Sequence, residues 1–172
     1  MGTRHNIELN PADFEVIARI AYQTSGLQLV KEKSSMIQSR LRHRVTELGF
    51  DDFTAYSRHI SSDAGKQELR NMISALTTNV SHFFREMHHF EILERKVVPL
   101  LKKRISAGQK VRIWSAGCSN GQEGYSIAMT LMESIPDLLS YDVKILGTDI
   151  DPKVVEFASA GEYPKRLLDG VP

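Results

Sequence analysis

Apolar residues recur every three or four positions along the first 75 residues, which is the spacing of amphipathic helices. Asn10 and Pro11 suit the cap and first position of a helix, and Gly26 suits its end. A second helix is predicted from about Lys33 to Leu48, and two more should follow it. The apolar stripe of the second helix is formed by Ile37, Leu41, Val45 and Leu48. We therefore predict an all-helical domain over residues 1–76.

Residues 77–109 form a linker segment followed by a helix. The first positions of this linker are polar or β-branched, which is poor material for the interior of a helix. The paired aromatic residues Phe83 and Phe84 come next, beside Arg85, as in a binding loop. A helix cap formed by Asn79 or Ser81 is the alternative interpretation, and it is compatible with binding.

The helix of this segment is predicted from Phe90 to Ser106. Pro99 lies inside it, and proline removes a backbone donor that a helix needs. We therefore expect a kink or a break into two helical pieces.

Residues 110–172 alternate between strand and helix patterns. A β-branched strand begins at Val111 and leads through a glycine-rich turn into a helix over Tyr125–Ser134. A second strand, Val143–Thr148, is followed by a helix that starts near Pro152. The inward side of the first of these helices is predicted to carry Ile127, Ala128, Leu131 and Met132. The order β-α-β-α predicts two parallel strands joined by a right-handed crossover.

Composition is that of a globular protein, with 41% hydrophobic and 25% charged residues in a chain of 172. The net charge of +1 gives no strong field toward nucleic acid or anionic lipid. No stretch approaches the roughly 20 apolar residues of a membrane span, and the single cysteine suits a reducing compartment. We expect a cytoplasmic protein without membrane insertion.

Basic residues gather on the second helix. Arg40, Arg42 and Arg44 stand there beside further lysines and a histidine, against few acids. Such a run is usually a solvated face, and the alternative is a docking surface for an acidic partner. His82, His88 and His89 could suggest a metal, but exposed helix histidines explain them better, and we predict no metal site.

The glycine-rich turn after the first strand is the candidate ligand site. Gly117, Gly121 and Gly124 match neither a dinucleotide fingerprint nor a phosphate-binding P-loop. Asp149 follows the second strand, where an acid can accept hydrogen bonds from a ribose diol. Asp151 is expected to cap the next helix. A turn and an acid in this order predict a nucleotide-type cofactor.

Three segments together resemble the CheR family, which comprises S-adenosylmethionine-dependent enzymes that esterify glutamate side chains of bacterial chemoreceptors. They are Thr77–Glu86 with His89 and Phe90, then Trp114–Glu123, and then Gly147–Asp151. The resemblance implies an α/β fold: a small all-helical N-terminal domain, then the first β-α-β-α part of a Rossmann-like class I methyltransferase sheet. It also implies S-adenosylmethionine as cofactor and S-adenosylhomocysteine as product.

The resemblance assigns roles residue by residue. Asn79, Ser81 and Arg85 match the cofactor-contacting positions of the family's linker, with Arg85 near the methionine end and the reacting centre. In the methyltransferase part, the matching positions are Gly117, Glu123 and Asp149. Arg40, Arg42 and Arg44 match the surface that faces methyl-accepting chemotaxis receptors, whose helical bundles are acidic. Cys118 is expected to be a small residue of the turn rather than a nucleophile.

This chain is shorter than the family's proteins, so we expect a fragment truncated on the C-terminal side. Two strands make a marginal sheet, and oligomers could form through its exposed edges. The alternative function is a non-catalytic module that binds cofactor, acidic receptor helices or both. Nucleic-acid methylation is disfavoured because the net charge is nearly neutral and no matching base-binding motif is present.

Overall fold

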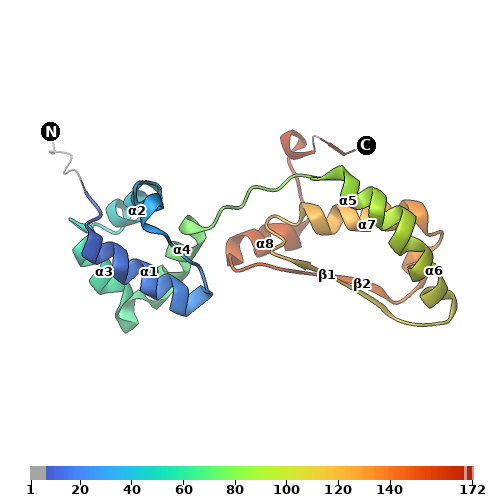
Figure 1. Ribbon diagram of the computed structural model, residues 1–172, viewed down its shortest axis with the longest axis horizontal. Coiled ribbons are helices and arrows are strands. Elements are labelled where there is room, and N and C mark those ends of the chain that lie inside the picture. Colours follow the sequence, from blue (N-terminus) through green and yellow to red (C-terminus); the bar gives the residue numbers. More distant parts are fainter. Residues whose placement is uncertain (1–6, 169, 172) are drawn as a thin grey trace. The chain divides into compact units, whose positions relative to one another are not determined.

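The computed structural model describes residues 7–168 and 170–171, and it divides into two compact units between Thr78 and Asn79 (Figure 1). The predicted linker over residues 77–109 thus lies mostly within the second unit. Among the described residues, no helix has both the length and the apolarity that crossing a membrane requires.

The first unit is built from four helices, as the apolar spacing predicts. These are α1 (Pro11–Ser25), α2 (Ser34–Glu47), α3 (Phe53–Ile60) and α4 (Lys66–Leu76), with short 3₁₀ helices at Lys31–Lys33 and Asp63–Gly65. Asn10 caps α1 by accepting a hydrogen bond from the Asp13 N–H, and Gly26 ends it with a left-handed φ of 72°. The stripes of all four helices meet in one core, whose largest fully buried members are Tyr56, Phe53, Ile17, Ile37, Leu41 and Met72.

The second unit begins with the linker and a helix that is interrupted where proline predicts it. α5 (Met87–Ile92) passes through a π-helical turn, Leu93–Val97, into α6 (Val98–Ser106). Pro99 stands in the first turn of α6, where the missing N–H costs nothing. The π-helical turn lies directly before it, and there the Val98 N–H donates to the Leu93 carbonyl oxygen, five residues back. The expected break is confirmed.

The two strands pair in parallel, as expected from the β-α-β order. β1 (Val111–Ala116) and β2 (Val143–Thr148) run in register from Val111 opposite Val143 to Ala116 opposite Thr148. Between them lies α7 (Gln122–Ser134), and a short 3₁₀ helix, Leu138–Ser140, leads into β2. α8 (Pro152–Ala160) follows β2, and the last described helix is a 3₁₀ turn at Lys165–Leu167.

The helices of the second unit cover one face of this sheet (Figure 1). Inward residues of β1 join α6 and α7 in a small core of Val98, Ile105, Val111, Leu131 and Ile135. The opposite face carries Trp114 and Leu146, which are register partners and are both exposed.

Two inward assignments from the sequence are wrong. Leu48 follows the last residue of α2 and is exposed, because the helix ends before it completes the stripe. Met132 is also exposed, because α7 turns Ser126 and Thr130 inward instead. Their hydroxyls donate to the carbonyl oxygens of Gln122 and Ser126, which makes burial of these polar side chains inexpensive.

Candidate functional site

The glycine-rich turn is anchored to the end of β2. Gly117 and Cys118 both donate their N–H groups to the Thr148 carbonyl oxygen, at 2.8 and 2.9 Å. Gly121 has a φ of 89°, and a Cβ there would lie 2.8 Å from the Ala158 Cβ. A side chain at residue 121 would therefore clash as well as strain the backbone, so the turn requires glycine at this position.

Asp149 faces this turn, as the order of strand, turn and acid predicts. Its Oδ2 accepts a hydrogen bond from the Ser119 N–H at 2.8 Å, and its Oδ1 accepts from the Asp151 N–H at 2.9 Å. Ser119 holds a left-handed φ of 49° to make this contact. Because each carboxylate oxygen can accept more than one hydrogen bond, the half-buried Asp149 still has capacity for a diol.

Glu123 lies in the first turn of α7, near the positive end of the helix dipole. Its Oε1 accepts a hydrogen bond from the buried Ser115 hydroxyl of β1, at 2.6 Å. This hydrogen bond holds the exposed Glu123 carboxylate at the carboxyl end of β1, beside the glycine-rich turn.

The linker segment also reaches the carboxyl ends of the two strands. Asn79 donates from Nδ2 to the Oδ2 of Asp151 at 2.7 Å, across 72 positions of sequence. Further along, the Phe84 N–H donates to the Ser126 hydroxyl of α7 at 2.9 Å. The structure thus brings Asn79 and the Asp149 loop together. The interpretation of Asn79 or Ser81 as a helix cap is wrong, because Glu86 occupies the cap position of α5.

Arg85 stands exposed on this linker, between two residues with left-handed backbones. Phe84 has a φ of 53° and Glu86 a φ of 58°, both unusual for residues with side chains. The Arg85 guanidinium donates to the Val80 carbonyl oxygen at 2.9 Å, which folds the linker back on itself. The hydroxyl of the half-buried Ser81 makes no hydrogen bond to the part of the chain that the structure describes.

An aromatic cluster around Tyr163 packs against the glycine-rich turn. No motif in the sequence near Tyr163 indicates this cluster. The Tyr163 ring packs edge-on against Phe83, Tyr125 and Phe157, with centroids 5.0, 5.7 and 5.4 Å away. Its hydroxyl donates to the Asn120 carbonyl oxygen of the turn. Burial, with smaller contributions from Tyr125 and Cys118, raises the pKa of Tyr163 to about 12, so its hydroxyl remains a donor.

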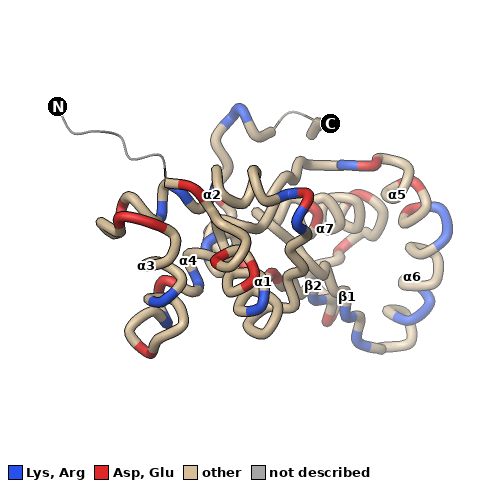
Figure 2. The backbone as a smooth tube through the Cα atoms, turned by 60° about the vertical axis from the view of Figure 1, so that its left-hand side comes forward, with Lys and Arg blue, Asp and Glu red and all other residues tan. Residues whose placement is uncertain are grey.

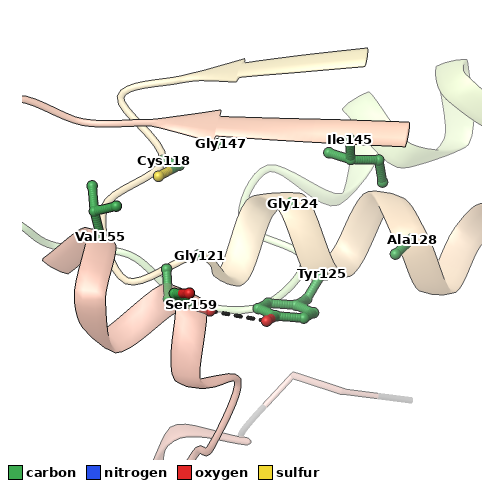
Figure 3. Close-up of a pocket in the computed structure, with 10 residues that line it drawn as sticks. Cys118, Gly121, Gly124, Tyr125, Ala128, Ile145, Gly147, Val155 and Ser159 are labelled. Atoms are coloured by element: carbon green, nitrogen blue, oxygen red, sulfur yellow. Dashed lines mark hydrogen bonds between the residues drawn. The ribbon is translucent and has the colours of Figure 1, made fainter. Parts of the chain in front are cut away.

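A cavity of about 410 Å³ opens between α7, α8 and β2, beneath the turn (Figure 3). Its walls are mostly apolar, including Ala128, Ile145 and Val155, and neither Asp149 nor Glu123 lines it. The Cys118 side chain borders it and is only 4% exposed. Burial first, and then the charges of Asp149 and Glu123, raise the pKa of this thiol, which keeps it protonated. That agrees with a small residue of the turn rather than a nucleophile.

The three arginines of α2 have different surroundings. Arg40 donates to the carbonyl oxygens of Leu76 and Thr77, at 2.7 and 2.9 Å, and so caps the end of α4. Arg44 is paired with the buried Glu68. The Arg42 side chain is exposed and makes no hydrogen bond or ion pair within the described residues.

Two buried oxygens beside the turn lack partners within residues 7–168 and 170–171. They are the Ser119 Oγ and the Gln122 Oε1. These two oxygens lie just before and at the start of α7, and the Ser119 N–H donates to the Asp149 carboxylate, which can accept further hydrogen bonds. Such a group of acceptors fits a ligand that carries several hydroxyl or amino groups. A nucleoside-type cofactor has this chemistry.

Comparison with known proteins places both units in one family. Residues 12–77 match the family model described as CheR methyltransferase, all-alpha domain, and residues 79–172 match CheR methyltransferase, SAM binding domain. The relative named "probable chemotaxis protein methyltransferase" from Rhizobium etli is 46% identical over 87% of this chain and 56% of its own length. Chemotaxis protein methyltransferases from Borreliella burgdorferi and Escherichia coli are 36% and 37% identical, over 97% and 94% of this chain.

The chain spans about 60% of the Borreliella relative and 54% of the Escherichia coli relative. The boundary between the two matched regions coincides with the break between the two structural units. With an all-helical unit, a parallel β-α-β-α unit and matches over nearly its whole length, this chain belongs to the CheR methyltransferase family.

Proposed function

We propose that this chain binds S-adenosylmethionine and supplies the cofactor-binding part of a methyltransferase that esterifies glutamate side chains of chemotaxis receptors. The observation that carries the proposal is that Asp149, the glycine-rich turn and the Asn79 linker lie together at the carboxyl ends of the two strands. The named activity of the relatives and the matched SAM binding domain support it.

In this proposal Asp149 accepts hydrogen bonds from the two ribose hydroxyls. Gly117 and its neighbours let the backbone approach the ligand closely, and Glu123 offers a second carboxylate for a donor of the cofactor. From the linker, Asn79 and Ser81 contribute polar contacts. Arg85 contributes a cation that holds the carboxylate of the methionine end near the reacting centre.

The cofactor, when bound, supplies a methyl group activated by a sulfonium. The receiving glutamate is already ionised at neutral pH, so no side chain of this protein has to remove a proton. The contribution of this chain is alignment and removal of water around the reacting carboxylate. Arg85 lies on the linker, where it can orient the methionine end without exchanging a proton.

Receptor docking is assigned in the same proposal to the basic face of α2, with Arg40, Arg42 and Arg44. The partner would be an acidic helical bundle of a methyl-accepting receptor, and the protein would act in the cytoplasm. Arg42 is the member of this set whose charge is directed to solvent. This surface also supports a second candidate function, a module that docks on receptors without transferring methyl groups.

Self-association is a further part of the proposal. Each strand of the sheet has one edge unpaired within the described residues, and Trp114 and Leu146 are exposed on its outer face. A second copy could cover these groups. Sedimentation should show a dimer or larger species at working concentration, and a strict monomer would contradict this part.

Calorimetry with S-adenosylhomocysteine tests the cofactor assignment. Asp149→Ala should weaken binding at least about tenfold, which corresponds to the loss of a hydrogen-bonded charged group. Asp142→Ala is the matched control, because Asp142 precedes the same strand and is exposed, paired with Arg112. Equal affinities of wild type and Asp149→Ala would refute the ribose assignment.

Transfer of labelled methyl from S-adenosylmethionine to receptor glutamates separates the two candidate functions. Transfer supports the enzyme. Receptor binding without transfer by this chain would leave only the docking module.

A further inference from the structure

Asp151, which the sequence predicts as a helix cap, makes more contacts than a cap requires. Its Oδ1 accepts a hydrogen bond from the Lys153 N–H at 3.0 Å, which caps α8 as expected. Its Oδ2 accepts from the Asn79 Nδ2 at 2.7 Å, and its own N–H donates to Asp149. The residue is only 1% exposed. A cap needs one carboxylate oxygen, so the second has a separate use.

The chemistry of the contact fixes how the Asn79 amide is turned. A carboxylate only accepts hydrogen bonds, so the NH₂ group of Asn79 must face Asp151. The orientation of an amide is ordinarily ambiguous, because nitrogen and oxygen are alike in size. Here the charged partner removes the ambiguity and turns Oδ1 away from Asp151. Within the described residues, no donor reaches that oxygen.

We propose that Asp151 is a positioning residue that locks Asn79 with its Oδ1 presented as an acceptor for a hydroxyl or amino group of the cofactor. The inference rests on the proposed cofactor site and adds the element that orients it. Through its backbone N–H, Asp151 also holds Asp149, so one buried residue aligns a contact from the linker and a contact from β2.

Burial makes this lock stiff. Charge-assisted hydrogen bonds are short and strong, and the 2.7 Å distance between Asn79 and Asp151 is in that range. Away from water, the carboxylate has no competing solvent donor, so the amide loses its freedom to flip. A pre-oriented acceptor costs less ordering when ligand binds.

Asp151→Asn tests the lock with little change in shape. Asparagine is an equally good helix cap, so α8 should persist. The new Nδ2 can donate to the Asn79 Oδ1 and reverse its amide, which removes the acceptor. We expect affinity for S-adenosylhomocysteine, measured by calorimetry, to fall about tenfold, as for Asn79→Ala.

Two further variants isolate the cause. Asp52→Asn changes another aspartate cap, that of α3, and should leave affinity unchanged. The double variant Asn79→Asp/Asp151→Asn reverses the polarity of the hydrogen bond and leaves an acceptor oxygen at residue 79. It should recover most of the lost affinity, whereas a purely structural role for Asp151 would not be rescued by a change at residue 79.

The outcomes are distinct. A loss in Asp151→Asn with recovery in the double variant supports the positioning role. Unchanged affinity in Asp151→Asn, or a loss that the double variant does not recover, overturns it while the proposed function stands. Failure of the wild-type chain to bind S-adenosylhomocysteine refutes the proposed cofactor site, and the positioning role with it.

Discussion

Arg44→Ala should destabilise the helical unit severely, although Arg44 belongs to the basic face assigned to receptor docking. The guanidinium of Arg44 pairs with Glu68 through Nε, at 3.0 Å, and through Nη2. Glu68 also accepts hydrogen bonds from the Tyr56 hydroxyl at 3.0 Å and from Asn71 at 3.3 Å. Removing Arg44 would leave the Glu68 carboxylate buried without its cation.

The magnitude follows from the burial of the two partners. The Glu68 side chain is 4% exposed and that of Arg44 is 17% exposed. Breaking a buried pair by deleting one partner typically costs about 3–5 kcal/mol. Since Tyr56 and Asn71 would remain, we expect the lower end, about 3 kcal/mol of unfolding free energy. For a unit of this size that lowers the Tm by about 12 °C or more.

Urea unfolding followed by circular dichroism measures this loss. Arg42→Ala is the matched control on the same helix, and an exposed substitution of this kind should stay within about 0.5 kcal/mol of wild type. The two variants also separate folding from docking, because only Arg42→Ala should weaken receptor binding while stability is kept. An Arg44→Ala protein within about 1 kcal/mol of wild type would refute the assignment of a buried ion pair.

Two further predictions concern acid and the turn. Burial alone would raise the pKa of Glu68, but the hydrogen bonds from Arg44, Tyr56 and Asn71 outweigh it and lower the pKa. The stabilisation should thus be complete above the unfolded value of about 4.3 and be lost as pH falls through the lower folded pKa. Urea midpoints between pH 5 and 3 should therefore fall less steeply in Glu68→Gln. Gly121→Ala should cost about 1–3 kcal/mol from its φ, with a further loss from the clash with Ala158. Calorimetric unfolding should show a larger loss than in Gly26→Ala, whose φ is also positive but whose Cβ would meet nothing within 4 Å.

The parts of the fold that the sequence predicted are those governed by neighbouring residues. β2 occupies the predicted residues, Val143–Thr148, because this short segment contains several residues that favour strands and is followed by Asp149 and by Pro152, which starts α8. The cap at Asn10 and the break before Pro99 depend on one side chain and its own backbone. The position of Asp149 beside the turn also follows from local order, because parallel strands end at the same edge.

Contacts between distant residues carry no such local signal. The Asn79–Asp151 hydrogen bond joins positions 72 residues apart, and the Tyr163 cluster gathers aromatics from four segments. The inward serine and threonine of α7 were missed for a related reason. Hydropathy counts a hydroxyl as polar, although a hydroxyl that donates to its own helix backbone can be buried.

The arginines of α2 show why charge patterning alone overestimates a docking surface. Arg40 and Arg44 are one turn apart on the same helix, but both make contacts within the helical unit. Arg40 donates to the carbonyl groups that end α4, and Arg44 forms an ion pair with Glu68. An acidic partner would have to compete with these contacts to recruit either guanidinium. The Arg42 side chain has no hydrogen-bond or ion-pair partner among the described residues, so the receptor-docking prediction rests chiefly on Arg42. The exposed Lys and Arg positions of α6 offer a second basic stretch, in the methyltransferase unit (Figure 2). An acidic receptor bundle should therefore contact arginine on α2 through far fewer groups than the sequence suggests, with a correspondingly shallow dependence of binding on salt.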